Sequence, residues 1–159
     1  MMIKKILIGI DDSKHAENAA KYGFDIAHKF NAAVGLVNIV EPAMMPQMAG
    51  TADPVMGMPM QGTGIENMEI LDIQRNQSEN IVDSAIKKFA GGMKVTHFTE
   101  YGSTADGIIT CAKEFEADLI VIGTHSRHGL DRLLMGSVAE HVVRHSEVPV
   151  LVVPMKENS

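Results

Sequence analysis

The sequence has little of several features that mark particular protein classes. Cys111 is the one cysteine among 159 residues, so the chain cannot form an internal disulfide and fits a reducing compartment. Basic residues are outnumbered, 14 against 20 acidic ones, and the net charge of -6 argues against a general nucleic-acid or anionic-membrane surface. No apolar run approaches membrane-spanning length, and the first one, Ile6–Ile10, is too short for a signal peptide. We expect a cytoplasmic protein with neither a nucleic-acid nor a membrane partner.

Several phosphate-binding and catalytic motifs are also missing. The chain contains no G-x-x-x-x-G-K-[ST], the motif of P-loop hydrolases. The residues Gly9–Ser13 after the first apolar run supply neither the G-x-G-x-x-G of a dinucleotide-binding dehydrogenase nor the S-G-G-x-D-S turn of adenylating enzymes. No nucleophile and base are paired at a recognisable spacing. Fast catalysis is therefore not predicted.

Apolar residues make up 45% of the chain, enough for the core of one domain. Short apolar runs without polar alternation are typical of strands covered on both faces. Amphipathic segments with helical spacing lie between them. This alternation predicts a three-layer, doubly wound α/β domain with five parallel strands in the order 3-2-1-4-5. The predicted strands are Lys4–Ile10, Ala32–Val40, Lys94–Tyr101, Ala117–Gly123 and Val148–Val153.

Helix boundaries and buried faces follow from spacing. Asp11, Asp12 and Ser13 offer side-chain oxygens for the start of the first helix. Ser103-x-x-Asp106 and Ser137-x-x-Glu140 are capping-box patterns. Alternation in the third strand places Val95, His97 and Thr99 on one face, and Cys111 is assigned to the core. The predicted buried stripes are Ala16, Ala20, Phe24, Ala27 and Phe30 in the first helix, and Ala105, Ile108, Ile109, Ala112 and Phe115 in the third.

Residues 42–64 break the pattern. Between Glu41 and Gly64 lie four of the six prolines, four glycines and six of the 12 methionines. We interpret this stretch as a long mobile excursion after the second strand, with helical spacing resuming near Ile65 and ending at Gly91–Gly92. The spacing of Met56, Met58 and Met60 is compatible with copper(I), but a flexible apolar flap is the favoured interpretation because no cysteine or histidine joins them.

Doubly wound sheets bind ligands beyond the carboxyl ends of their strands. Three segments are predicted to lie there: Asp11–Ser13, Ile39–Glu41, and the loop GTHSRHGLDRLLMGSV that follows the fourth strand. This loop combines glycines, hydroxyls and arginines and ends on Gly136 and Ser137 at the start of a helix. Backbone N–H groups and the helix dipole at such a position favour an anion.

Nearly the whole chain resembles the universal stress protein family. ILIGIDDS is similar to the family's first strand and acidic turn, and ADLIVIGTHSRHGLDRLLMGSVAEHVVRHSEVPVLVV to its C-terminal signature. ATP-binding members carry G-x2-G-x9-G-S/T. Gly123, Gly136 and Ser137 match this motif, whereas Ser126 replaces the second glycine. A Cβ at that position costs about 1 kcal/mol if φ must be positive.

The resemblance implies one domain spanning residues 1–159 that binds ATP, AMP or ADP, with Mg²⁺ held through the phosphates, and that regulates a stress response with at most slow hydrolysis. Asp11 would face the ribose or the Mg²⁺, or only cap its helix. Ile39 would offer backbone groups to adenine, while Arg127 and Arg132 would neutralise phosphate charge or be solvated. The nucleotide-binding residues implied are Gly9, Asp11, Ser13, Ile39, Gly123, Thr124, His125, Ser126, Arg127, Gly136, Ser137 and Val138.

Two further interpretations remain open. The alternative function is a nucleotide-free, dimeric interaction protein. Either function is compatible with a homodimer through Val148–Val153, an apolar edge strand that many family members use to dimerise. His141 and His145 have the i, i+4 spacing of a zinc pair, but with no third ligand apparent in the sequence a solvated helix face is favoured.

Overall fold

The computed structural model describes residues 2–41, 64–124 and 136–155. Strands and helices alternate along the chain, which agrees with the pattern in the sequence. The predicted excursion after the second strand, with Met56, Met58 and Met60, lies outside the described residues. The elements are β1 (Lys5–Gly9), α1 (Lys14–Phe30), β2 (Ala33–Val40), α2 (Gly64–Phe89), β3 (Val95–Tyr101), α3 (Thr104–Phe115), β4 (Leu119–Gly123), α4 (Ser137–His145) and β5 (Val150–Val153).

The five strands form one parallel sheet in the order β3-β2-β1-β4-β5, which confirms the predicted topology. β1 lies at the centre, where Ile6 pairs with Val34 of β2 on one side and with Leu119 of β4 on the other. The chain first winds outward through β2 and β3 and then crosses back to β4 and β5. The crossovers that leave β1 therefore diverge between β1 and β4, and a ligand crevice is expected there.

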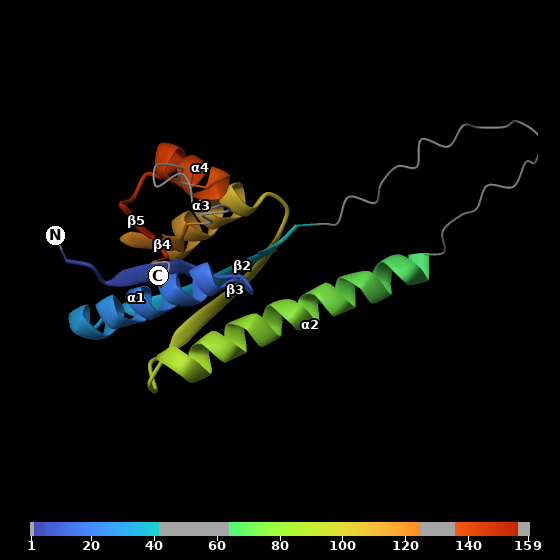
Figure 1. Ribbon diagram of the computed structural model, residues 1–159, viewed down its shortest axis with the longest axis horizontal. Coiled ribbons are helices and arrows are strands. Elements are labelled where there is room, and N and C mark those ends of the chain that lie inside the picture. The colour runs from blue at the N-terminus through green and yellow to red at the C-terminus, as the bar shows by residue number, and fades with distance from the viewer. Residues whose placement is uncertain (1, 42–63, 125–135, 156–159) are drawn as a thin grey trace, which may run out of the picture.

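Helices cover both faces of the sheet (Figure 1). Alternate residues of β1 separate the two cores: Ile6 and Ile8 face α1 and α2, whereas Leu7 faces α3 and α4. All three side chains are fully buried. Cys111 lies in the second core, as predicted, and burial, followed by the charges of Glu100 and Glu114, raises the pKa of its thiol to about 12. A thiol so strongly protonated is a packing residue and not a nucleophile.

Three local predictions were wrong. Phe30 is 51% exposed, because α1 ends there and the chain turns through Asn31 in a left-handed conformation. Ser103 is the N-cap of α3 but its hydroxyl makes no capping hydrogen bond, and the carboxylate of Asp106, the other residue of the predicted box, lies 3.0 Å from Nε2 of His141 in α4. The helix after the loop begins one residue earlier than the sequence pattern suggests.

Gly136, not Ser137, is the N-cap of that helix, α4, and no side chain in the described part of the chain caps it. Ser137 is already its first helical residue, and Glu140 pairs with Arg144 at 2.7 Å, one turn further on. The Ser137-x-x-Glu140 capping box is therefore absent. An uncapped helix end leaves its first amide groups without a side-chain acceptor from the cap residue.

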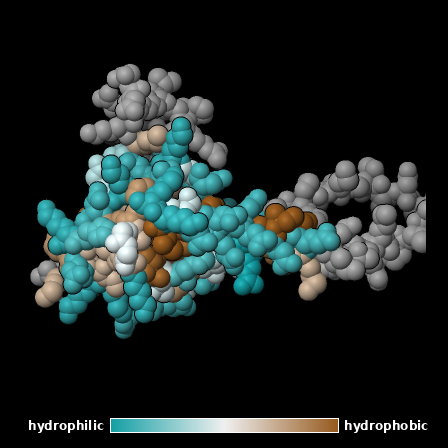
Figure 2. Space-filling model, turned by 90° about the horizontal axis from the view of Figure 1, so that it is seen from below, coloured by the Kyte–Doolittle hydropathy of each residue, from teal (hydrophilic) through white to brown (hydrophobic). Residues whose placement is uncertain are grey.

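The long helix α2 begins and ends as predicted. Its C-terminal half packs on the sheet through Val82, and the buried Ser78 hydroxyl lies 3.3 Å from the Thr99 hydroxyl of β3. Its N-terminal half extends beyond the sheet (Figure 1), where Figure 2 shows apolar side chains on the surface. These exposed residues are Met68, Ile70, Leu71 and Ile73. Among the described residues, no helix combines the length and apolar character that crossing a bilayer requires.

Candidate functional site

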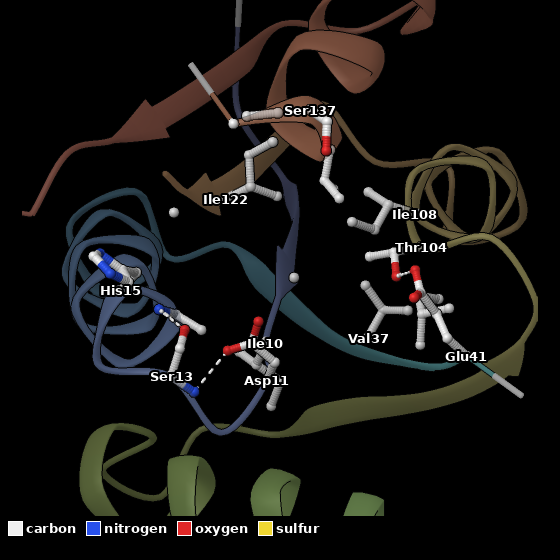
Figure 3. A pocket seen from close by; sticks show the side chains of 17 residues that line it. Ile10, Asp11, Ser13, His15, Val37, Glu41, Thr104, Ile108, Ile122 and Ser137 are labelled. Carbon is white, nitrogen blue, oxygen red and sulfur yellow. Dashed lines mark hydrogen bonds between the residues drawn. The ribbon is translucent and has the colours of Figure 1, made fainter. Parts of the chain in front are cut away.

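A cavity of about 650 Å³ opens at the carboxyl ends of β1, β2 and β4 (Figure 3). The starts of α1, α3 and α4 border it, because in this fold each helix begins where the preceding parallel strand ends. Its walls mix apolar side chains with hydroxyls, carboxylates and glycines. The lining residues are Gly9, Ile10, Asp11, Ser13, His15, Ala16, Val37, Ile39, Glu41, Thr104, Ile108, Ile122, Gly123, Gly136, Ser137, Val138 and Ala139.

The loop from β1 to α1 is held by its own side chains. The Asp11 carboxylate accepts a hydrogen bond from the Ser13 amide at 2.7 Å, and the Ser13 hydroxyl accepts one from the Ala16 amide at 3.1 Å. Both bonds are visible in Figure 3. Ser13 is therefore the N-cap of α1, as the sequence predicts. The exposed Asp11 carboxylate lies at the cavity wall with its orientation fixed.

Gly123 ends β4 where the chain passes close to α1. A Cβ at this position would lie 2.6 Å from the backbone carbonyl oxygen of His15. Backbone atoms cannot turn aside as a flexible side chain does, so any larger residue would displace α1 or β4. The first glycine of the predicted phosphate loop thus has a packing reason of its own, independent of any ligand.

The start of α4 forms the cavity wall beyond Gly123. Gly136, Ser137, Val138 and Ala139 all line the cavity, and the first intrahelical bond runs from the Glu140 amide to the Gly136 carbonyl. No side chain caps this end. Within the described part of the chain, the amides of the first turn therefore remain available to an acceptor, and the helix dipole adds positive potential. This wall of the cavity is suited to an anion.

The opposite wall is mainly apolar. Val37, Ile39 and Ile108 line it, and Ile39 packs so closely on α3 that a Cβ on Gly107 would lie 2.6 Å from its Cδ1 atom. At the rim, the Thr104 hydroxyl donates to Oε1 of Glu41 at 2.5 Å, joining the residue after β2 to the first residue of α3. The cavity is therefore asymmetric, with donors at the α4 end and a carboxylate at the α3 end.

The structure brings eight of the 12 predicted binding residues to this one cavity. They are Gly9, Asp11, Ser13, Ile39, Gly123, Gly136, Ser137 and Val138. Thr124 follows Gly123, but its amide donates to the Val153 carbonyl of β5 and it is not a lining residue. His125, Ser126 and Arg127, together with Arg132, lie outside the described residues.

Several lining residues were not among the predicted binding residues. His15 and Ile108 were overlooked as site residues because they occur within helical patterns, where a histidine or isoleucine carries no positional signal. Glu41 and Thr104 are 63 residues apart along the chain, and only the pairing of β2 with β3 brings them together. Glu41 belongs to the segment Ile39–Glu41 that was predicted to lie at this edge of the sheet, whereas Thr104, three residues after the third predicted strand, gave no signal.

The histidine pair on α4 contacts α3. His141 Nε2 lies 3.0 Å from Oδ1 of Asp106, and His145 Nδ1 lies 2.9 Å from the His141 carbonyl oxygen. The two rings are 4.2 Å apart between centroids. Among the residues that the structure describes, no three His, Cys, Asp or Glu side chains are arranged to hold a metal ion.

Comparisons with known proteins agree with the fold. The universal stress protein family model matches residues 2–154. Universal stress protein MJ0531 of Methanocaldococcus jannaschii is 34% identical over 98% of this chain and 86% of its own length. The solved structure of the hypothetical protein MJ0577 is 25% identical, with a TM-score of 0.76 over 99% of this chain and 100% of that chain.

Two more distant structures were determined with ligands. A universal stress protein in complex with cAMP is 23% identical, with a TM-score of 0.64 over 97% of this chain and 98% of that one. The universal stress protein from Archaeoglobus fulgidus in complex with dAMP is 22% identical, with a TM-score of 0.54 over 96% and 98% of the two chains. The family model spans nearly all of the sequence and the sheet order is the expected one. The chain belongs to the universal stress protein family.

Proposed function

We propose that this protein is an adenine-nucleotide-binding regulatory module that binds ATP in the cavity between β1, β2 and β4. The observation that carries the proposal is the uncapped start of α4 at the cavity wall. Phosphate oxygens are strong acceptors, and the first-turn amides of a helix bind them without any basic side chain. The neighbouring Gly123 adds close access to the backbone.

The ligand class is supported by the shape and chemistry of the cavity. Its size suits a nucleotide, since small-molecule sites typically enclose about 300–1,000 Å³. The apolar residues Val37, Ile39 and Ile108 offer a surface for a flat base. Adenine is the part that the cAMP and dAMP of the related structures have in common.

Residues at the cavity and in the following loop offer partners for each part of an ATP molecule. The α4 amides and Gly123 would hold the phosphates, together with Thr124, His125, Ser126 and Arg127 of the loop. Asp11 would face the ribose or a Mg²⁺ ion that the phosphates carry, because Mg²⁺ is usually bound by one or two carboxylates plus phosphate oxygens. The sequence offers no paired nucleophile and base, so any hydrolysis is expected to be slow. We place the protein in the cytoplasm, acting in a stress response.

Calorimetric titration with Mg²⁺ and ATP tests the proposal. The wild-type protein is expected to bind with a Kd in the micromolar range or weaker. The Gly136→Asp variant is expected to lose binding, because it places a carboxylate beside the phosphates. Gly136 has a φ of -52°, so the substitution strains no backbone.

Gly91→Asp is the matched control. It adds the same charge in the turn before β3, at a φ of +54° that strains most side chains and that aspartate adopts more readily than most, so a thermal melt must show that the variant is folded. It should bind ATP like the wild type. If the folded wild-type protein binds no adenine nucleotide, the alternative function, a nucleotide-free dimeric interaction protein, replaces this proposal.

A further inference from the structure

Two of the described carboxylates line the cavity, Asp11 and Glu41, and the family resemblance implies a nucleotide-binding role for Asp11 alone. Glu41 follows the last residue of β2, and its Oε1 atom accepts the Thr104 hydroxyl at 2.5 Å. In Figure 3 the Glu41 side chain points toward Thr104, and Ile108 and Thr104 separate it from Ser137 of α4. We propose, building on the proposed function, that Glu41 is the base-specificity residue of this site and selects a base carrying an exocyclic amino group.

The first step concerns the direction in which a nucleotide lies. The phosphates carry the ligand's negative charge, and the uncapped α4 end attracts them. The Glu41 carboxylate repels them from the α3 end, although the start of α3 is also a helix N-terminus. Of the three helix starts that border the cavity, that of α1 is capped by Ser13, that of α3 has the Glu41 carboxylate beside it, and that of α4 has neither among the described residues. The base therefore lies at the Glu41 end.

The second step concerns which part of the ligand meets Glu41. The apolar residues Ile39 and Ile108 lie next to Glu41 and Thr104, and a flat base fits such a surface better than a sugar with its hydroxyls. Asp11, on the β1 loop, is the carboxylate proposed above to face the ribose or the Mg²⁺ ion. The edge of the base, not the sugar, then faces Glu41.

The third step concerns hydrogen-bond polarity. An ionised carboxylate only accepts hydrogen bonds. Thr104 uses Oε1, and no other described residue donates to Glu41. An amino group, as on adenine, donates to the remaining oxygen. A keto oxygen in the same place, as on hypoxanthine, sets two acceptors against each other and leaves both unpaired, which is how sites reject close analogues.

Thr104 is a positioning residue in this arrangement. It is the first residue of α3, so its hydroxyl is fixed by the helix backbone and holds the Glu41 carboxylate at the rim. Because Glu41 is exposed, the discrimination is expected to be modest compared with a fully buried site. We expect ATP to bind about tenfold more tightly than ITP, its hypoxanthine analogue.

The test compares ATP, ITP and 2′-deoxy-ATP by calorimetric titration in the presence of Mg²⁺. In Glu41→Gln the preference for ATP over ITP should fall to near one, since an amide can donate to the keto oxygen. Thr104→Val keeps the shape of the side chain but removes the hydroxyl. Its preference for ATP over ITP should lie between those of the wild type and Glu41→Gln. Glu114 is an exposed glutamate on α3, the helix that carries Thr104. Glu114→Gln is the control and should keep the wild-type preference for ATP over ITP. Thermal melts establish that each variant is folded.

The outcomes separate this inference from the proposed function. If the wild type binds ATP and ITP equally, or if Glu41→Gln keeps the full preference, the role of Glu41 is overturned while nucleotide binding stands. If 2′-deoxy-ATP binds poorly and Glu41→Gln removes that difference, Glu41 recognises the sugar and the inference is wrong. If the wild type binds none of the three nucleotides, the proposed function fails and the inference with it.

Discussion

The side chain of Asn38 donates a hydrogen bond from Nδ2 to the carbonyl oxygen of Ile10 at 2.8 Å. Asn38 is only 5% exposed. The bond joins β2 to the start of the β1–α1 loop, directly before Asp11, and the Ile10 amide donates to the Val37 carbonyl in the same place. One buried amide therefore fixes the loop that forms part of the cavity wall.

Replacing Asn38 with Leu is expected to lower the free energy of unfolding by about 1–3 kcal/mol, because a buried carbonyl loses its donor. ATP binding should weaken in parallel, since Asp11 loses its support. Urea denaturation and calorimetry measure the two effects. Asn76→Leu, on the exposed face of α2, should stay within about 0.5 kcal/mol of the wild type. An equally small effect in Asn38→Leu would contradict the assigned role.

Gly23 and Ile8 offer a test of packing between α1 and β1. A Cβ on Gly23 would lie 2.5 Å from the Cδ1 atom of Ile8, whose side chain is fully buried. Gly23→Ala should overpack this contact, and Ile8→Val should relieve it in part, because valine lacks the Cδ1 atom but keeps a Cγ1 atom, which in Ile8 would lie 2.8 Å from the added Cβ. In a double-mutant cycle, Gly23→Ala should be less destabilising by about 1 kcal/mol in the Ile8→Val background. Additive effects on urea stability would show that the helix simply moves away.

Asp118 predicts a pH dependence of stability. Hydrogen bonds from the backbone amides of Lys4 and Lys5, at 2.8 and 2.9 Å, lower the pKa of this carboxyl below its usual value. A carboxyl with a lowered pKa in the folded state stabilises the protein above its unfolded pKa of about 3.9, and the contribution is lost as the pH falls through the folded value. Asp118→Asn should therefore be less stable than the wild type at pH 7.

The difference between Asp118→Asn and the wild type should shrink as the pH falls below about 4. Chemical denaturation across that range measures it. Asp83→Asn, an exposed substitution on α2, serves as the control and should follow the wild type at every pH. A gap of constant size from pH 7 downward would show that Asp118 acts through something other than its charge.

The edge strand β5 predicts the assembly state. The Pro149 and Val153 carbonyls accept hydrogen bonds from β4, so by alternation the backbone of Val150 and Val152 points to the free edge. We predict a homodimer through this edge. Val152→Pro should break the dimer by removing an outward donor while leaving the β4–β5 ladder intact. Light scattering tests this, and a monomeric wild type at high micromolar concentration, or a dimeric variant, would refute it.

The order of strands and helices was predictable because the strands other than β3 are apolar runs, β3 shows alternation, and the helices between them have periodic apolar stripes. Local hydrogen bonds were predicted less well. Ser103 and Ser137 satisfy a capping pattern, yet the Asp106 and Glu140 side chains have other partners, His141 and Arg144. A pattern four residues long does not contain those competitors. Ser13, with no such competitor, caps its helix as predicted.

The residues of the candidate site also fall into predicted and unpredicted ones. Gly123 and Gly136 were found through their spacing, which the family resemblance supplied. Asn38 and Thr104 gave no signal, because their importance comes from contacts with residues 28 and 63 positions away along the chain. The contact between Gly123 and His15 is equally invisible in the sequence. Side chains that support a site through contacts distant in sequence can be identified only from the three-dimensional structure.

The central position of β1 also determines when the cavity can exist. Lys5 of β1 and Asp118, which precedes β4, are 113 residues apart, and the cavity opens between those two strands. A chain emerging from the ribosome can pair β1 with β2 early, since these strands are close in sequence. It cannot close the longer loop until β4 has been synthesised, because closing it costs entropy that only late contacts repay. A nucleotide therefore cannot assist the early steps of folding, and binding ability appears only once nearly the whole chain is complete.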